Sequence, residues 1–190
     1  MSKKEKNLDI YISKLLENTD IDYSADGSDI KEINEALKTA SKKGTGRVGF
    51  PEFVGISKEF IIVIEDKADL DKQVKYSDEE QNTLANDVKS LKDYAENGAV
   101  HYGKHIIENT AFKKVFAFGC SGDEKHHLIR PIFINEDGYN LLEPVENFEN
   151  FSALNIDKYY REQVLKEKPA ETLQLEEVLK KSAELHEALR

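Results

Sequence analysis

The sequence predicts an α/β fold, with a mixed central β-sheet flanked by helices and a helical extension at the C-terminal end. Two observations lead to this class. Segments with apolar residues at helical spacing alternate along the chain with short, continuous apolar runs that are typical of buried strands. The elements follow in the order helix, strand, strand, helix, strand, strand, helix, and helices in that order can cover both faces of a sheet.

The N-terminal part predicts two helices. The first covers residues 8–16, where apolar residues stand at positions 8, 12, 15 and 16. The second covers residues 28–42, after a turn at Asp26-Gly27, and Ser28 is its candidate N-cap. Its apolar positions are Ile30, Ile33, Leu37 and Ala40. A basic, glycine-containing loop over residues 41–47 follows it.

Four strands and a central helical region come next. The first two strands are expected over 48–56 and 59–66. Ser77 and Glu80 form a capping box that predicts a helical start, with an apolar period continuing to Ile106 and an interruption at Gly98. The other two strands are expected over 112–118 and 128–134.

Pro144 and a run of acids predict a domain boundary near residue 145. The expected domains are therefore 1–145 and 146–190, the second being a helical extension. The apolar stripe of its last helix consists of Leu173, Leu175, Val178, Leu179, Ala183 and Leu185. Because this helix runs to Arg190 without a C-cap glycine, we expect the natural chain to continue.

Composition excludes several classes of protein. The net charge of -10 opposes a free-standing DNA-binding protein, which is usually basic. Cys120 is the only cysteine, so an intramolecular disulfide and a four-cysteine zinc site are excluded, and a cytoplasmic location is expected. No run reaches the ~18 apolar residues of a membrane span, so no membrane partner is expected.

Acidic and basic residues lie at the ends of the first two predicted strands. Pro51-Glu52 lies in the first strand, and Glu65-Asp66-Lys67 ends the second. If the turn is centred on Ser57 and Lys58, Glu52 lies opposite Val63 and diagonal to Glu65, ~7–8 Å away. Because side chains alternate between faces, Glu65 and Lys67 share one face. Two carboxylates at this spacing suit Mg²⁺, which activates water and stabilises charge on a phosphate.

These residues resemble the PD-(D/E)xK nuclease signature, with Pro51-Glu52 as its first half and Glu65-x-Lys67 as its second. The resemblance implies a restriction-endonuclease-like core and Mg²⁺-dependent cleavage of DNA by a metal-activated water. It also implies that Lys67 either orients that water or neutralises the transition state, and that the Asp66 carbonyl is a further metal ligand. The family often adds an acid from the preceding helix, for which Glu32 is preferred over Glu35. Glu52 replaces the family's usual aspartate.

A longer resemblance runs from Gly46 to Ile134 and includes Tyr94–Tyr102 and Phe116–Gly122. This stretch is similar to the N-terminal nuclease domain of bacterial restriction-modification proteins, in which the nuclease precedes an N6-adenine DNA methyltransferase, as in type IIG enzymes and relatives of type I subunits. The resemblance implies methyltransferase and target-recognition domains in the same chain or in a partner chain. Methyltransferase motifs are absent from these 190 residues.

The remaining candidates allow two readings each. Lys42, Lys43 and Arg47 either contact DNA phosphates beside the site or form a solvated loop. Tyr94 and His101 share a helix face and either line the cleft or pack in the core. Two other functions stay open: a catalytically idle nuclease-fold module for DNA or protein interaction, and an unrelated cytosolic interaction protein. A divalent-metal titration separates them from a nuclease.

Overall fold

The computed structural model describes residues 3–167, 177–182 and 184–186. The chain forms two compact units, residues 1–156 and 157–190. The first unit therefore extends past the boundary expected at residue 145, because Phe148 and Phe151 pack their rings against Phe118. The division into a nuclease domain and a linker stays a prediction, since it concerns domains of a longer protein.

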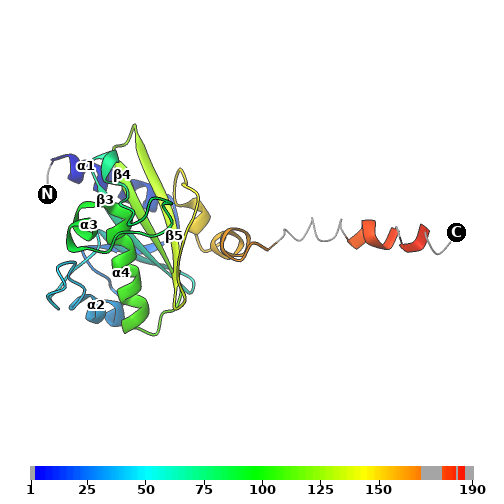
Figure 1. Ribbon diagram of the computed structural model, residues 1–190, viewed down its shortest axis with the longest axis horizontal. Coiled ribbons are helices and arrows are strands. Elements are labelled where there is room, and N and C mark those ends of the chain that lie inside the picture. Colours follow the sequence, from blue (N-terminus) through cyan, green and yellow to red (C-terminus); the bar gives the residue numbers. More distant parts are fainter. Residues whose placement is uncertain (1–2, 168–176, 183, 187–190) are drawn as a thin grey trace. The chain divides into compact units, whose positions relative to one another are not determined.

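The first unit contains one six-stranded mixed sheet, which confirms the α/β class (Figure 1). Its strands lie in sequence order: β1 (Asp22–Ala25), β2 (Phe53–Ser57), β3 (Phe60–Lys67), β4 (Val115–Gly122), β5 (His127–Asn135) and β6 (Gly138–Leu141). Neighbouring strands are antiparallel except β3 and β4, which are parallel. A parallel pair needs a long crossover. Here the crossover contains α3 (Val88–Asp93) and α4 (Ala95–Asn109).

Helices cover both faces of the sheet. α4 and α2 (Lys31–Leu37) share a core with the side chains of Ile61 and Val63 on one face of β3. α1 (Lys3–Glu17) also packs against β3, and Figure 1 shows it behind the sheet when α4 is in front. Its buried residues Leu8 and Ile12 are not part of the α4 core. The sheet is thus enclosed between α1 and the α2–α4 pair.

The central helical region differs from the prediction. No helix begins at Ser77: the Asp78 carboxylate accepts the amides of Asn82 and Thr83 and closes a loop instead. The first helix of the crossover begins after Asp87, whose carboxylate caps two amides of α3. The helical period then breaks at Tyr94, which has an extended backbone, and not at Gly98.

α5 (Ile156–Tyr159) begins at the last residue of the first unit and is followed in the second unit by a π-helical turn over Tyr160–Val164. Residues 177–182 and 184–186 are helical, in line with the predicted last helix. Of its apolar stripe, Val178, Leu179 and Leu185 are exposed, whereas Leu173, Leu175 and Ala183 lie outside the described residues. Within the parts of the chain that the structure describes, no helix has the length and apolarity needed to cross a membrane.

Candidate active site

The β2–β3 hairpin brings the two predicted glutamates together. Phe53 pairs with Ile64, so Glu52, one residue before β2, falls opposite Glu65. The predicted register, with Glu52 opposite Val63, was wrong by two residues, because the turn contains Lys58 and Glu59 rather than Ser57 and Lys58. A shift of two residues keeps Glu52 beside Glu65 at the end of the hairpin. Glu65 lies on the α4 face, whereas Glu52 precedes β2 and lines a cavity with Asp9 of α1.

Glu65 is the buried centre of this cluster. Its side chain is 2% exposed, and its Oε1 atom accepts hydrogen bonds from the ammonium groups of Lys67, at 3.0 Å, and Lys42. Lys67 Nζ also donates to the Asp66 carbonyl at 2.8 Å. Glu65 Oε2 has no hydrogen-bond partner among the residues that the structure describes. One carboxylate oxygen is therefore held by two cations, while the other is buried without a partner.

Glu52, which directly precedes β2, completes the cluster. Burial, then the negative charges of Glu65 and Asp9, raise the pKa of Glu52 to about 7, although Lys67 and Lys42 oppose the shift. For Lys67, burial alone would lower the pKa, but the contact with Glu65 outweighs it and the pKa is raised. Two carboxyl groups and two ammonium groups thus share one partly buried end of the sheet.

Asp66 points to the opposite face of β3, as the alternation of side chains requires. It is 2% exposed, and burial, then a hydrogen bond that the protonated Asp66 carboxyl donates to Asp9 of α1, raise its pKa. Only the Asp66 carbonyl is turned toward Lys67. Asp9 was not among the predicted site residues, although it directly follows the buried Leu8 on the apolar side of the first helix. Asp9 and Asp66 form a second acidic pair behind the sheet.

The acid expected from the second helix does not reach this cluster. Glu32 accepts the backbone amide of Ala111, just before β4 begins at Val115. Glu65 pairs with Gly119, towards the other end of β4. Glu35 forms an exposed ion pair with Lys38. Both glutamates therefore lie away from Glu65, because α2, which carries them, lies beside the opposite end of β4.

The predicted DNA-contacting residues separate into two groups. Lys43 and Arg47 are exposed on the loop over residues 41–47. Lys42 instead turns inward, where its side chain is 13% exposed and lies 4.9 Å from the Tyr102 ring centroid. It belongs to the glutamate cluster rather than to the basic surface.

His101 and Tyr94 also occupy different places. His101 Nε2 donates to the Ala40 carbonyl at 2.9 Å and so holds the segment that leads to Lys42. Burial is the main cause that lowers the pKa of His101. Tyr94 lies before α4, and Lys72 Nζ stands 5.1 Å from its ring centroid. Because the helix breaks at Tyr94, the two residues do not share one face as predicted.

Gly98 allows α4 to approach the cluster closely. A Cβ atom at this position would lie 3.0 Å from both Glu65 Cγ and Lys42 Nζ. Any larger side chain would therefore push against the ion pair. The sequence offered no signal for this contact, since a glycine inside a helical pattern is equally compatible with an interruption.

A buried polar network supports the end of the sheet beside Lys67. Gln73 Nε2 donates to Glu96 Oε1 and to the Gly119 carbonyl, each at 2.9 Å, while Gln73 Oε1 accepts the Ser121 hydroxyl at 2.6 Å. Arg130 pairs with Glu96 at 3.4 Å. Ser121 is the β4 partner of Lys67 in the sheet. The network joins the first turn of α4 to the strand beside the lysine, and sequence reasoning missed it.

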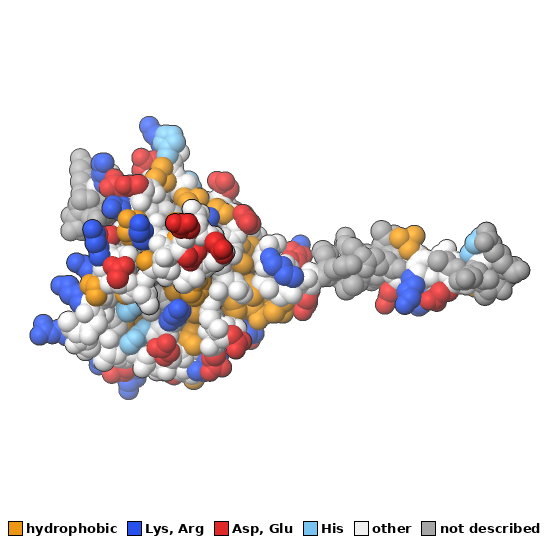
Figure 2. Space-filling view, in the orientation of Figure 1, with side chains coloured by type: hydrophobic (Ala, Val, Ile, Leu, Met, Phe, Trp, Pro, Cys, Tyr) orange, Lys and Arg blue, Asp and Glu red, His pale blue; other side chains and the backbone are white. Residues whose placement is uncertain are grey.

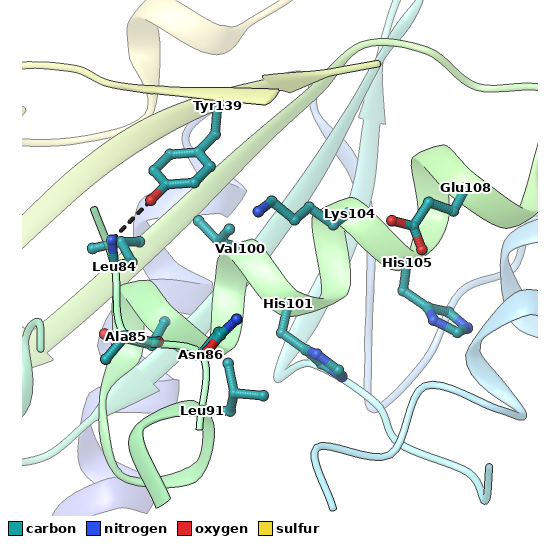
Figure 3. Close-up of a pocket in the computed structure, with 11 residues that line it drawn as sticks. Leu84, Ala85, Asn86, Leu91, Val100, His101, Lys104, His105, Glu108 and Tyr139 are labelled. Atoms are coloured by element: carbon teal, nitrogen blue, oxygen red, sulfur yellow. Dashed lines mark hydrogen bonds between the residues drawn. The ribbon is translucent and has the colours of Figure 1, made fainter. Parts of the chain in front are cut away.

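A cavity of about 250 Å³ lies along α4. Figure 3 shows that α4 contributes His101, Lys104 and His105, and that Asn86 and Tyr139 come from segments facing it. The Tyr139 hydroxyl accepts the Leu84 amide at 2.8 Å and closes one side. Through His101 the cavity borders the segment that carries Lys42.

The chemistry of the cluster fits a hard divalent cation. Within the described ranges, no three His, Cys, Asp or Glu side chains are grouped closely enough to hold a metal ion. Mg²⁺ does not need such a cage, because it binds through one or two carboxylates and keeps several waters. Glu52, Glu65 with its unpartnered Oε2, and the Asp66 carbonyl supply oxygen donors of this kind.

Comparison with known proteins relates the chain to a restriction enzyme. It is 37% identical, over an alignment of 192 residues, to the type II restriction enzyme and methyltransferase RM.BcgI of Heyndrickxia coagulans. The alignment takes in the whole of this chain but only 30% of that protein. The chain thus spans less than a third of the length of this relative. No family model and no solved structure matches the chain.

Proposed function

We propose that this chain is the endonuclease part of a restriction-modification protein of the PD-(D/E)xK type, and that it hydrolyses DNA phosphodiester bonds with Mg²⁺. The observation that carries the proposal is the convergence of Glu52, Glu65 and Lys67 at one end of the sheet. The 37% identity to a type II restriction enzyme and methyltransferase supports the choice of DNA as substrate.

Each residue has a distinct role in the proposed reaction. Glu52 and Glu65 hold the cation, with the Asp66 carbonyl as a further oxygen donor. Bound Mg²⁺ supplies an activated water and positive charge beside the scissile phosphate. Lys67 is fixed by Glu65 and by the Asp66 carbonyl, so its ammonium group is presented to the attacking water or to a phosphate oxygen. Buried positive charge at this place stabilises a developing oxyanion.

In the proposed enzyme, target binding depends on partner domains. The chain carries a net charge of -10, and Figure 2 shows acidic and basic side chains interspersed on the visible face of the first unit. Such a surface does not attract a phosphate backbone as a whole. We therefore assign DNA targeting to methyltransferase and target-recognition domains in the same chain or a partner chain, as in a cytoplasmic type IIG or type I-like enzyme.

A chimaera tests the proposal in a setting that provides those domains. This chain replaces the matching segment of RM.BcgI, and cleavage of plasmid DNA is measured with Mg²⁺. Lys67→Ala is expected to abolish cleavage, whereas Lys38→Ala, which removes the same charge from an exposed lysine beside the opposite end of the strand, is expected to retain it. A Lys67→Ala chimaera as active as its parent would reject the role of Lys67.

One observation favours the catalytically idle module as the second candidate. Lys42 and Lys67 already neutralise Glu65, and two ammonium groups on one carboxylate also satisfy a purely structural role. Mn²⁺ titration of the 190-residue chain by calorimetry separates the two functions. A nuclease site binds Mn²⁺ and loses that binding in Glu65→Gln, while an idle module shows no binding in either protein.

A further inference from the structure

We infer that Lys42 is an internal counter-ion of the metal site: it pairs with Glu65 in the metal-free protein, and a divalent cation displaces it. This inference rests on the proposed function, because it concerns the same carboxylate. It adds a positioning residue that neither the predicted signature nor the relative's name assigns. The displaced ammonium group would then be free to pair with a phosphate of the substrate.

The burial of Glu65 explains why a counter-ion is present. A carboxylate that is 2% exposed has lost almost all contact with water, and a buried charge needs a partner to offset that loss. Lys67 supplies one cation at 3.0 Å and Lys42 supplies a second on the same oxygen. The second cation stands beside the carboxylate that a metal ion would also use.

Of the two lysines that contact Glu65, Lys42 is the one that can move away from the carboxylate. Lys67 lies on the same strand as Glu65 and is also tied to the Asp66 carbonyl at 2.8 Å. Lys42 belongs to the loop over residues 41–47, where Gly44 and Gly46 adopt left-handed backbone angles and a Cβ atom on either would meet no other atom within 4 Å. The inward part of Lys42 contacts the Glu65 carboxylate and the Tyr102 ring.

Electrostatics couples this movement to both ligands. A divalent cation bound to Glu65 repels an ammonium group in contact with the same carboxylate, and the repulsion is strong where water is largely excluded. Metal binding therefore includes the work of separating Lys42 from Glu65. A phosphodiester beside the site gives the released ammonium a new anionic partner. By thermodynamic linkage, DNA then raises the affinity for metal, and metal raises the affinity for DNA.

The experiment measures metal affinity directly, without cleavage. The 190-residue chain and its variants are titrated with Mn²⁺ by calorimetry, near neutral pH and at low salt. Lys42→Met is expected to bind Mn²⁺ at least about tenfold more tightly than the wild type. Lys42→Arg keeps the charge and is expected to stay within about twofold of the wild type. Lys43→Met, the matched control, removes an exposed charge from the same loop and is expected to change affinity less than about twofold.

Each result bears on the inference. Wild type and Lys42→Met with equal Mn²⁺ affinity would overturn it and leave the proposed metal site standing. An equal gain in Lys43→Met would also overturn it, because the effect would then be general electrostatics. No binding in either wild type or Lys42→Met would sink this inference and the proposed function together. Circular dichroism checks the fold, and Lys42→Gln takes the place of Lys42→Met if that variant does not fold.

Discussion

Replacing Glu52 by Gln is expected to stabilise the metal-free protein at about pH 8 and to change its stability little at about pH 5. Burial and the charge of Glu65 raise the pKa of Glu52 from 4.5 to about 7. Between these two values the folded protein binds more protons at Glu52 than the unfolded chain does, so stability falls as pH rises through this window. Since one pKa unit corresponds to ~1.4 kcal/mol, the cost of an ionised Glu52 reaches at most about 3 kcal/mol above pH 7. Glutamine does not ionise and avoids this cost.

Urea unfolding with a chelator, at both pH values, measures the effect. Glu143→Gln is the control, because it makes the same chemical change at an exposed position and is expected to have little effect at either pH. A stability difference between wild type and Glu52→Gln that does not depend on pH would refute the reasoning. The same variant is expected to lose Mn²⁺ binding, because Glu52 is one of the two proposed metal-binding carboxylates.

Three further predictions concern packing, capping and DNA. Gly119→Ala is expected to lower the free energy of unfolding by about 2–4 kcal/mol, because its Cβ would lie 2.6 Å from the Glu96 amide nitrogen; a cost below about 1 kcal/mol would contradict this. Gly103→Ala meets side-chain atoms alone, the end of Ile134 and Val115 Cγ1, and is expected to cost less than about 1 kcal/mol in the same urea titration. Asp87→Ala is expected to cost about 1 kcal/mol in thermal unfolding, since Asp87 caps α3, and a neutral result would reject the cap. The 190-residue chain is expected to bind DNA only weakly at near-physiological salt, because of its charge of -10, and tight, specific binding in a Ca²⁺ titration would overturn that view.

The central part of the fold could be predicted from the sequence because burial leaves a clear pattern. β3 and β4 are covered on both faces, and a strand of this kind appears as a continuous apolar run. β1 and β6 were missed because each is a four-residue edge strand with polar residues, and its pairing depends on the neighbouring strand. The helix start predicted at Ser77 was wrong for a related reason. The Asp78 side chain accepts backbone amides to close a loop, and the same kind of local hydrogen bond also caps helices.

The candidate site was predictable only where it is local in sequence. Glu52, Glu65 and Lys67 belong to one hairpin, so the pairing of its two strands was enough to bring them to one end of the sheet, even with the register wrong by two residues. Lys42 and Asp9 come from segments that are distant in sequence from Glu65 and Asp66. Only the packing of those segments brings them to β3. Sequence spacing carries no information about such contacts.

The end of β3 separates two kinds of acid by strand geometry alone. Glu65 faces α4 and contacts two lysines, while Asp66, the next residue, faces α1, where burial and Asp9 raise its pKa. The raised pKa of Asp66 favours its neutral form, so Asp66 does not add to the negative charge of Asp9 on the α1 side. A charge-removing change at Asp66 should therefore act mainly through stability, whereas the same change at Glu65 should act mainly through metal binding. At the end of β3, the residue that faces α1 therefore contributes to stability, and the residue that faces α4 contributes to the proposed metal site.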